Sequence, residues 1–366
     1  MKIYAICFTP GGEETLGKIL DGFDRLMQEE LFVRAFALGS YRNQAGEPHG
    51  FDARVQAVQG RLSEWMAEAV QDADAFVFVG AAGIAIRAIA PYVEDKTKDP
   101  ALVVADEKGQ FVIPLLSGHI GGANELALRI AAELGAEPVL TTATDVRGLF
   151  AVDVFAKKND LWISDMKQAK LISARLVRGE KVGFYSDVPL EGKMPAELVN
   201  AVEQVHAKSS DETAVSCGIV ISAYEKQIFE DRLLLVPRCL TVGIGCKRGT
   251  AKEKILEAVQ EVFAQSGLSL KAICRIASIN LKKDEAGLIG TAQEFGVPFE
   301  TFSAEELAAV EGDFSESSFV KGVTGVDNVC ERAAVLASGG ALLVRKVAKD
   351  GVTAAVAIKI KNITIP

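Results

Sequence analysis

The chain has 366 residues, six cysteines and a formal net charge of -9. Apolar residues make up 49% and charged residues 24% of it, which is typical of a globular protein with a sizeable core. The acidic balance, without an obvious basic face, argues against a nucleic-acid partner. An anionic small molecule is not excluded, because it needs only a local positive pocket.

The apolar runs are shorter than the roughly 20 residues that a membrane-spanning helix needs. The N-terminal MKIYAICFTPGG alternates like a strand and lacks the long apolar region and cleavage site of a signal peptide. We therefore expect a cytoplasmic protein with no membrane partner. No CxxC occurs, and no cysteine–histidine cluster has zinc-ligand spacing, so we expect buried, reduced thiols and no protein metal site.

The length predicts two or three domains. Residues 1–145 alternate short apolar runs with amphipathic stretches, in the order KIYAICF, ETLGKILDGF, FVRAFAL, RLSEWMAEAVQDA, AFVFVG, GIAIRAIAPYV, ALVVAD, FVIPLLS, GANELALRIAAELG and PVLTTA. This alternation of strand and helix patterns predicts an open, mostly parallel α/β sheet. In such a sheet ligands bind beyond the carboxyl ends of the strands.

Residues 146–236 are predicted to form a smaller middle segment of α+β character, with a helix around KQAKLISARLV and a strand in KVGFYSD. A second α/β domain is predicted over residues 237–366. It begins with the strand LTVGIGC and the helix KEKILEAVQEVFAQSG and ends in a hairpin of ALLVRKVA and TAAVAIKI. The boundary between these two parts is placed at VPRC, residues 236–239.

Three glycine-rich turns between a strand and a helix are candidate anion-binding loops. Glycine permits positive φ and close approach to a ligand, and the following helix directs N–H groups and partial positive charge at the same point. The predicted substrate-binding residues are Gly80, Gly83 and Arg87 in the first turn, Ser117, Gly118, Gly121, Gly122 and Asn124 in the second, and Gly243, Gly245, Lys247, Arg248 and Gly249 in the third. For each turn the alternative is a tight connection that only packs a helix on a strand.

The third turn also has the spacing G-x-G-x-x-x-G, which raises dinucleotide binding as an alternative. That fingerprint expects an acidic residue near the end of the next strand to hold the ribose, but here the strand ends in Ser278, Ile279 and Asn280. Lys247 and Arg248 suit carboxylates or phosphates better. No GxxxxGK[ST] phosphate loop occurs either, so a nucleotide-binding enzyme is disfavoured.

A further glycine turn, GVTGVDNVCERAA, precedes the last predicted helix. Thr324, Gly325 and Asn328 are predicted to supply more substrate contacts. Glu331 lies three residues after Asn328 and therefore shares its helix face. The alternative is that these residues cap the helix, with Asp327 as a first-turn acid.

Several stretches together resemble the cobalt-precorrin-5A hydrolases of anaerobic cobalamin biosynthesis. They are residues 80–131, which include SGHIGGANELA, then VLTTATD, LTVGIGCKRGT and VKGVTGVDNVCERAAV. The resemblance covers nearly the whole chain and is weaker over the first 50 residues and the middle segment. It implies a hydrolase that opens the ring-A acetate δ-lactone of cobalt-precorrin-5A and releases the C20 bridge carbon with its methyl group as acetaldehyde, giving cobalt-precorrin-5B.

The resemblance also implies an anionic cobalt-tetrapyrrole substrate. The cobalt is carried by this substrate, so no cofactor and no protein metal site are expected. A non-catalytic tetrapyrrole carrier of the same pathway is the alternative, although a carrier has less need of a histidine in a glycine turn. A homodimer and hand-off to other cobalamin-pathway enzymes are further expectations.

Lactone opening needs an activated water and stabilisation of the developing oxyanion. His119 is the predicted general base, because imidazole titrates near pH 6.5. Asp145 or Glu125 is predicted to orient His119 or to serve in a second, retro-aldol-like step. The alternatives are a turn role for His119, a cap or turn role for Asp145 and first-turn helix chemistry for Glu125.

The N–H groups of Gly121, Gly122 and Ala123 are predicted to stabilise the oxyanion, and one such donor contributes about 3 kcal/mol. His49 and His206 lie in polar sequence, and both are expected to be solvated and dispensable.

Overall fold

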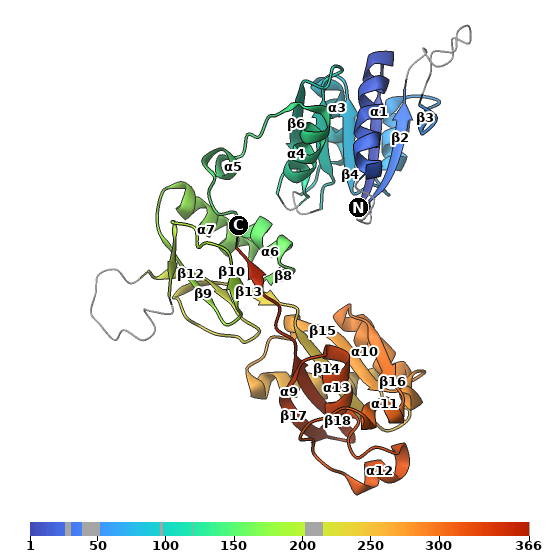
Figure 1. Cartoon of the computed structure of the whole chain (residues 1–366), viewed down its shortest axis with the longest axis vertical. Helices are drawn as coiled ribbons and strands as arrows, with labels where there is room; N and C mark the ends of the chain where they lie inside the picture. The colour runs from blue at the N-terminus through green and yellow to red at the C-terminus, as the bar shows by residue number, and fades with distance from the viewer. Residues whose placement is uncertain (26–30, 39–51, 96–97, 120, 202–214, 366) are drawn as a thin grey trace. The chain divides into compact units, whose positions relative to one another are not determined.

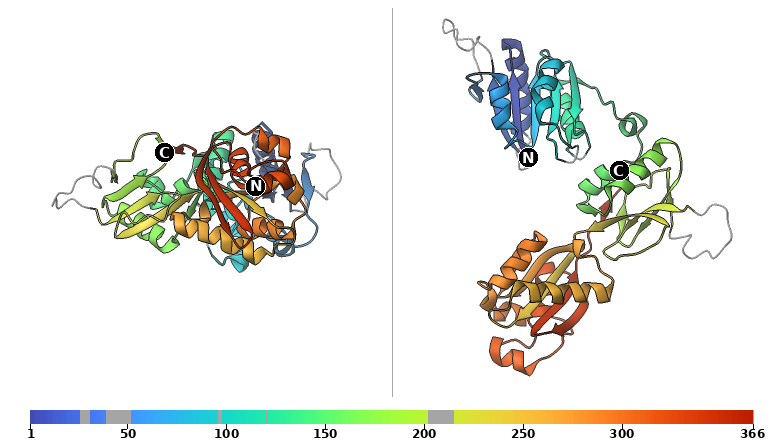
Figure 2. Two further views of the ribbon diagram at one scale, coloured as in Figure 1. Left: turned by 90° about the horizontal axis from the view of Figure 1, so that it is seen from below. Right: turned by 180° about the vertical axis from the view of Figure 1, so that it is seen from behind.

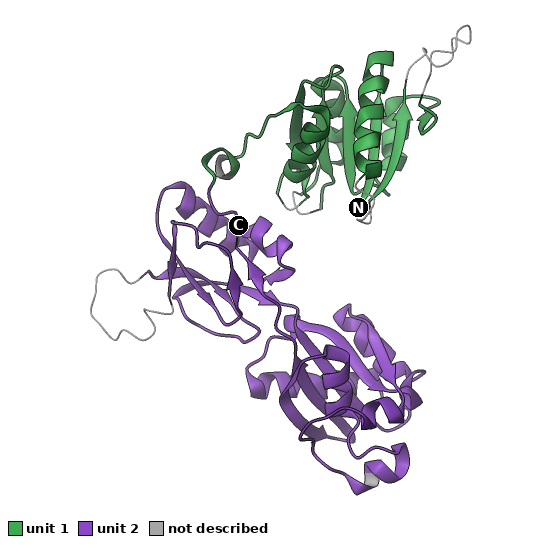
Figure 3. Ribbon diagram, in the orientation of Figure 1, with its two compact units in different colours: residues 1–148 green, residues 149–366 purple. Residues whose placement is uncertain are grey.

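The computed structural model describes residues 1–25, 31–38, 52–95, 98–119, 121–201 and 215–365 (Figure 1). His49 and His206 lie outside these described residues. The chain divides into two compact units, residues 1–148 and 149–366 (Figure 3), and each is described by itself. In the described ranges, no helix has both the length and the apolar character needed to cross a membrane.

The first unit is built on a seven-stranded sheet with the order β3-β2-β1-β4-β5-β6-β7. Its elements are β1 (Lys2–Cys7), α1 (Pro10–Arg25), β2 (Phe32–Ala37), β3 (Val55–Ala57), α2 (Leu62–Ala69), β4 (Ala75–Val79), α3 (Ala82–Ile89), the 3-10 turn η2 (Ala90–Tyr92), β5 (Ala101–Ala105), β6 (Phe111–Leu116), α4 (Ala123–Leu134), β7 (Glu137–Pro138) and α5 (Ala143–Arg147).

Helices cover both faces of this sheet, which explains why its central strands are apolar throughout. Successive strand residues point to opposite faces. Ile3 therefore packs in one buried cluster with Leu16 of α1 and Ile130 of α4, while Tyr4 packs in another with Met66 of α2. Burial on both sides is the usual setting of parallel strands, and the predicted α/β class is confirmed.

Strand β6 runs against its neighbour, although the strands from β1 to β5 are parallel. The connection from β5 to β6 spans only residues 106–110, whereas a parallel crossover needs about a dozen residues or more. Asp106 closes this turn, since its carboxylate accepts the N–H groups of Lys108 and Gln110. Leu116 consequently pairs with Leu102, and β6 ends at the edge where β4 and β5 begin.

The second unit contains a five-stranded sheet with the order β11-β9-β12-β13-β8, in which only β8 is antiparallel to its neighbour. Helices α6 and α7 pack on one face of it. The elements are α6 (Val152–Lys158), β8 (Leu161–Ile163), α7 (Met166–Val177), β9 (Val182–Ser186), β10 (Leu190–Glu191), β11 (Leu198–Asn200), β12 (Cys217–Ile221) and β13 (Asp231–Pro237).

A second five-stranded sheet of this unit has the order β16-β15-β14-β18-β17. Helices α9 and α10 pack on one face, and α11 and α13 pack on the other (Figures 1 and 2). The elements are β14 (Leu240–Cys246), α9 (Lys252–Ser266), η3 (Leu270–Ala272), β15 (Ile273–Ile279), η4 (Asn280–Lys282), α10 (Ala286–Phe295), β16 (Phe299–Phe302), α11 (Ala304–Ala308), α12 (Ser318–Thr324), α13 (Cys330–Ser338), β17 (Ala341–Lys349), β18 (Val352–Ile358) and β19 (Ile363–Thr364).

The two sheets of the second unit share buried structure. Val220 and Val236 of the first sheet lie in the same buried cluster as Leu240 of the second and Phe263 of α9. The chain end also returns to the middle part of the fold, because β19 pairs with β10 in a separate two-stranded sheet and Ile363 lies in the buried cluster of the first five-stranded sheet. The predicted C-terminal domain extends to residue 366, yet its last strand belongs to the middle part of the fold (Figure 1).

The returning tail is expected to stabilise the middle sheet. Ile363 is 3% exposed within the cluster formed by α6 and α7, whereas Ile360 is 48% exposed. Ile363→Ala should lower the free energy of unfolding by about 2–5 kcal/mol, while Ile360→Ala should change it little. Urea unfolding in a Trp65→Phe background, where Trp162 of β8 reports on the middle sheet, measures both. Equal effects of the two substitutions would contradict a structural role for the tail.

Candidate functional site

The turn that carries His119 joins β6 to α4 and is held by its own backbone. Ser117 has a φ of 55°, unusual for a residue with a side chain, and its hydroxyl donates to the carbonyl of Asp99 at 2.9 Å. A Cβ on Gly118 would lie 2.6 Å from the amide oxygen of Asn124. Glycine at this position therefore lets the Asn124 side chain fold back over the turn.

Three of the residues predicted from sequence meet at the carboxylate of Asp145. Its Oδ2 atom accepts a hydrogen bond from Asn124 Nδ2 at 2.7 Å and lies 3.0 Å from His119 Nε2. The Thr142 hydroxyl donates to the same oxygen. Thr142 was not predicted, although a threonine three residues before an aspartate is a common local hydrogen-bonding pattern.

This arrangement can hold and orient a base. When Nε2 of a neutral imidazole donates to a carboxylate, Nδ1 carries the lone pair that accepts a proton. The carboxylate then stabilises the imidazolium that forms. The side chains of His119 and Asp145 are 19% and 26% exposed, so they are partly shielded from water while still reachable. General acid–base catalysis requires a proton acceptor that is held in position and that substrate and water can reach.

Two other predictions for this turn are corrected by the geometry. The N–H of Gly122 donates to the carbonyl of His119, and the N–H of Ala123 donates to that of Ser117, so the turn itself uses two of the three expected oxyanion donors. Glu125 forms an exposed ion pair with Arg129 at 2.8 Å, one helical turn further along. The structure does not bring Glu125 to the Asp145 cluster.

The first glycine turn lies at the opposite edge of the same sheet. Gly80 follows β4, and its N–H donates to the carbonyl of Ala105 at the end of β5. Arg87 donates to the carbonyl of Gly83 in its own helix, at 3.2 Å. Because β6 is reversed, the His119 turn is at the edge where β4 and β5 begin, and the first two turns are not brought together.

The third turn presents two cations on the second unit. Lys247 and Arg248 are exposed, and neither forms an ion pair within the part of the chain that the structure describes. The turn is held by Glu285, which is 8% exposed and accepts the N–H of Gly249 at 2.6 Å. Lys282 lies 3.5 Å from the other oxygen of Glu285. Neither Glu285 nor Lys282 was predicted from the sequence.

Cys246 precedes the two cations and is half-buried. Burial raises the pKa of its thiol, Lys282 opposes the rise and Glu285 adds to it. A thiol with a raised pKa remains protonated at neutral pH, and the thiolate is the nucleophilic form. This position therefore does not favour nucleophilic catalysis by Cys246.

Gly243 and Gly245 have packing reasons for lacking a side chain. A Cβ on Gly243 would lie 1.9 Å from the carbonyl oxygen of Cys330, because α13 rests directly on β14. A Cβ on Gly245 would lie 2.7 Å from the hydroxyl of Thr353. Gly249 differs from both, since it has a φ of 74° and open space around it.

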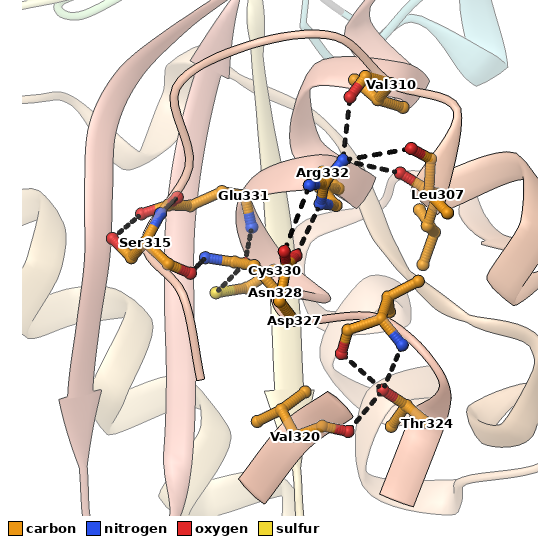
Figure 4. A network of polar contacts seen from close by, with 12 residues as sticks. Leu307, Val310, Ser315, Val320, Thr324, Asp327, Asn328, Cys330, Glu331 and Arg332 are labelled. Carbon is orange, nitrogen blue, oxygen red and sulfur yellow. Dashed lines mark hydrogen bonds and ion pairs between the residues drawn. The ribbon is translucent and has the colours of Figure 1, made fainter. Parts of the chain in front are cut away.

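The last glycine turn forms the network of polar contacts in Figure 4. Asn328 is 1% exposed, donates to the carbonyl of Ser315 at 2.8 Å and accepts the N–H of Glu331 at 2.9 Å. The Thr324 hydroxyl donates to the carbonyls of Val320 and Val326. Gly325 ends α12 with a φ of 83°. The geometry is that of helix caps, which was the alternative left open for Thr324, Gly325 and Asn328.

Glu331 completes this network from a fully buried position (Figure 4). Its carboxylate accepts the N–H of Ser315 at 2.7 Å, the hydroxyl of Ser315 at 2.8 Å and the N–H of Lys346 at 2.7 Å. A buried carboxylate needs such partners, because an unpaired one is costly to desolvate. Glu331 thus ties the loop before α12 to strand β17. Among the described residues, no group of three or more His, Cys, Asp or Glu side chains is placed to hold a metal ion.

Three family models match consecutive parts of the chain. They are "Cobalamin synthesis G N-terminal" over residues 64–145, "Cobalamin biosynthesis central region" over residues 150–237 and "Cobalamin synthesis G C-terminus" over residues 240–357. The cobalt-precorrin-5A hydrolase of Salmonella typhimurium is 37% identical over 96% of both chains. The chain belongs to the cobalt-precorrin-5A hydrolase family. The resemblance found in the sequence is confirmed.

Two further relatives match different lengths of the chain. The cobalt-precorrin-5A hydrolase of Priestia megaterium is 32% identical over 84% of both chains. Protein CobE of a Sinorhizobium species is 30% identical and is matched over 79% of its length by 32% of this chain. Part of the cobalt-precorrin-5A hydrolase chain is therefore similar to a smaller, separate protein.

The packing role of Gly243 can be tested against a binding role. Gly243→Ala should destabilise the second unit by about 3 kcal/mol or more, because its Cβ would meet backbone atoms that cannot rotate away. Gly322→Ala in α12 is the matched control, since nothing lies within 4 Å of a Cβ there. It should leave stability unchanged or raise it by about 0.5–1 kcal/mol. Urea unfolding measures both variants, and a stable Gly243→Ala protein with weakened substrate binding would favour the binding role.

Proposed function

We propose that this protein hydrolyses cobalt-precorrin-5A to cobalt-precorrin-5B and releases acetaldehyde. The observation that carries the proposal is the pairing of His119 with Asp145 in a half-buried turn. The two curated hydrolases that match most of the chain support the substrate class, a cobalt-bound tetrapyrrole.

In the first step His119 takes a proton from water, and the resulting hydroxide attacks the lactone carbonyl. The tetrahedral intermediate collapses, the ester C–O bond breaks and the alcohol oxygen on C20 is released and protonated. Asp145 stabilises the imidazolium throughout, since opposite charges at hydrogen-bond distance favour the charged form. The products of this step are the ring-A acetate carboxylate and a free hydroxyl on C20.

In the second step a base removes the proton from the C20 hydroxyl. The bond between C20 and the macrocycle breaks, its electron pair enters the conjugated ring and the C20 carbon leaves as the carbonyl carbon of acetaldehyde. His119, made neutral again by loss of its proton, is the base that the geometry offers for this step. The exposed cations Lys247 and Arg248 of the second unit are proposed to bind substrate carboxylates. Substrate binding by Gly80, Gly83 and Arg87 of the first unit stays a prediction.

Cytoplasmic location, homodimerisation and hand-off to other pathway enzymes stay predictions, as does the expectation of no cofactor. The carrier alternative differs from the hydrolase in a single measurable respect, because a carrier binds the tetrapyrrole without changing its mass.

Release of acetaldehyde tests the proposed function directly. Purified protein is incubated anaerobically with cobalt-precorrin-5A, volatile aldehyde is trapped and the tetrapyrrole mass is followed. We expect one acetaldehyde for each tetrapyrrole converted, with a matching mass change. Tight binding without a mass change would support the carrier and contradict the hydrolase.

The role of His119 is tested by substitution. His119→Ala should reduce turnover at least about 100-fold with the fold intact, which is the usual scale for a general base. Asp145→Asn removes the charge that stabilises the imidazolium and should also reduce turnover. Glu125→Gln should retain most activity, because Glu125 pairs with Arg129 away from the cluster. Steady-state rates and thermal melting are measured for all three variants, and near wild-type turnover of His119→Ala would remove His119 from the mechanism.

A further inference from the structure

A pocket of about 260 Å³ lies inside the second unit, away from all four glycine turns. Four segments that are distant in sequence meet there: the end of α6, the connection between β9 and β10, the connection between β13 and β14, and the tail that leads into β19. Its lining residues are Lys158, Asn159, Asp160, Val188, Pro237, Arg238, Cys239, Lys361, Asn362, Ile363 and Thr364.

Most of the charged residues in the lining are cations. Lys158, Arg238 and Lys361 all face this pocket, and its one acidic lining residue is Asp160. In the ranges that the structure describes, none of the three cations forms an ion pair or a side-chain hydrogen bond. All three cations are exposed, and they lie around one pocket although they come from distant parts of the sequence.

The fold holds the backbone of these cations in place. Asn159, next to Lys158, donates to the carbonyl of Thr364 at 3.0 Å and accepts its N–H at 2.8 Å. This pair joins the end of α6 to the tail that carries Lys361. The backbone next to Arg238 is held as well. The N–H of Cys239 donates to the carbonyl of Ala272 at 3.1 Å, and its carbonyl accepts the N–H of Lys359 at 3.1 Å.

Like charges gathered around a small concave space repel one another and create a positive potential there. Such a potential attracts a counter-ion and raises its local concentration. Arginine binds carboxylate and phosphate groups through paired N–H donors, and lysine binds them as a point charge. The free-energy cost of the repulsion is removed when an oxyanion occupies the pocket.

The size of the pocket limits what enters it. Pockets that hold drug-sized ligands usually measure about 300–1,000 Å³, and this one is smaller. A whole tetrapyrrole macrocycle does not fit in it, whereas a single carboxylate arm or a phosphate ion does. We propose that Lys158, Arg238 and Lys361 form a binding site for one oxyanion of the carboxylate or phosphate class. Only the identification of that oxyanion as a substrate arm rests on the proposed function.

Inorganic phosphate is the first probe. The melting temperature of the full-length protein is measured against phosphate concentration, with chloride added to hold the ionic strength constant. A ligand that binds only the folded state raises this temperature in a saturable way. The variant is Arg238→Gln with Lys361→Gln. Lys170→Gln is the control for loss of a positive charge elsewhere on the surface, because Lys170 is exposed on α7 and outside the pocket.

We expect wild type and Lys170→Gln to be stabilised alike and the double variant to need at least 10-fold more phosphate for the same shift. Without phosphate the double variant should melt at or above the wild-type temperature, because repulsion is relieved. Equal phosphate-induced shifts in all three proteins, or no saturable shift in wild type, would overturn the site.

A second measurement identifies the source of the oxyanion. If a substrate arm occupies the pocket, the double variant raises KM for cobalt-precorrin-5A with little change in kcat, and phosphate competes with substrate. If a free anion occupies it, the phosphate response is lost while KM is unchanged. The phosphate titration needs no turnover, so failure of the proposed hydrolysis and failure of this site are separate results.

Discussion

The reversal of strand β6 decides at which edge of the first sheet the His119 turn lies. The connection after β5 is too short for a crossover helix, so β6 must run back along its neighbour. Its end, and the turn with His119, then fall at the amino edge of the parallel strands. Ligands of open α/β sheets usually bind at the carboxyl edge, where Gly80 lies here. The short turn at residues 106–110 therefore places the Gly80 turn and the His119 turn at opposite edges of the sheet, although the two turns look equivalent in sequence.

Three side chains at that edge contact the Asp145 carboxylate. It receives Asn124 from the first turn of α4, Thr142 from the segment before α5 and His119 from the turn itself. The contact between His119 Nε2 and Asp145 Oδ2 fixes the orientation of the imidazole ring. The same contacts that order the turn thus orient His119, as the proposed proton transfer requires.

Glycine serves two different purposes in the second unit. At Gly243 the missing side chain lets α13 approach β14, while at Gly249 the backbone adopts a positive φ in an open turn beside Lys247 and Arg248. Two groups of cations without an ion pair lie in the described part of this unit, one at that turn and one around the pocket beside the tail. An acidic chain can bind anions at both places, because the pairing of the local charges matters more than the net charge.

The sequence by itself determined the α/β class, the run of most strands and helices, and the family. It also singled out His119 and Asn124 in a glycine turn and Asp145 at a strand end, and the structure brings these three together. These features are local, and periodicity and turn chemistry express them directly. Sequence reasoning did not find Thr142 and Glu285, and it gave Asn328 and Gly243 binding roles where the structure shows capping and packing contacts.

The tertiary structure alone decided which turns share an edge, which glycines face a helix and where the chain end returns. Each of these depends on contacts between segments far apart in the chain, such as Cys330 against Gly243 or Thr364 against Asn159. Local patterns carry no information on such contacts. The direction of β6 follows from the short connection before it, but which strands pair with one another is a property of the whole fold.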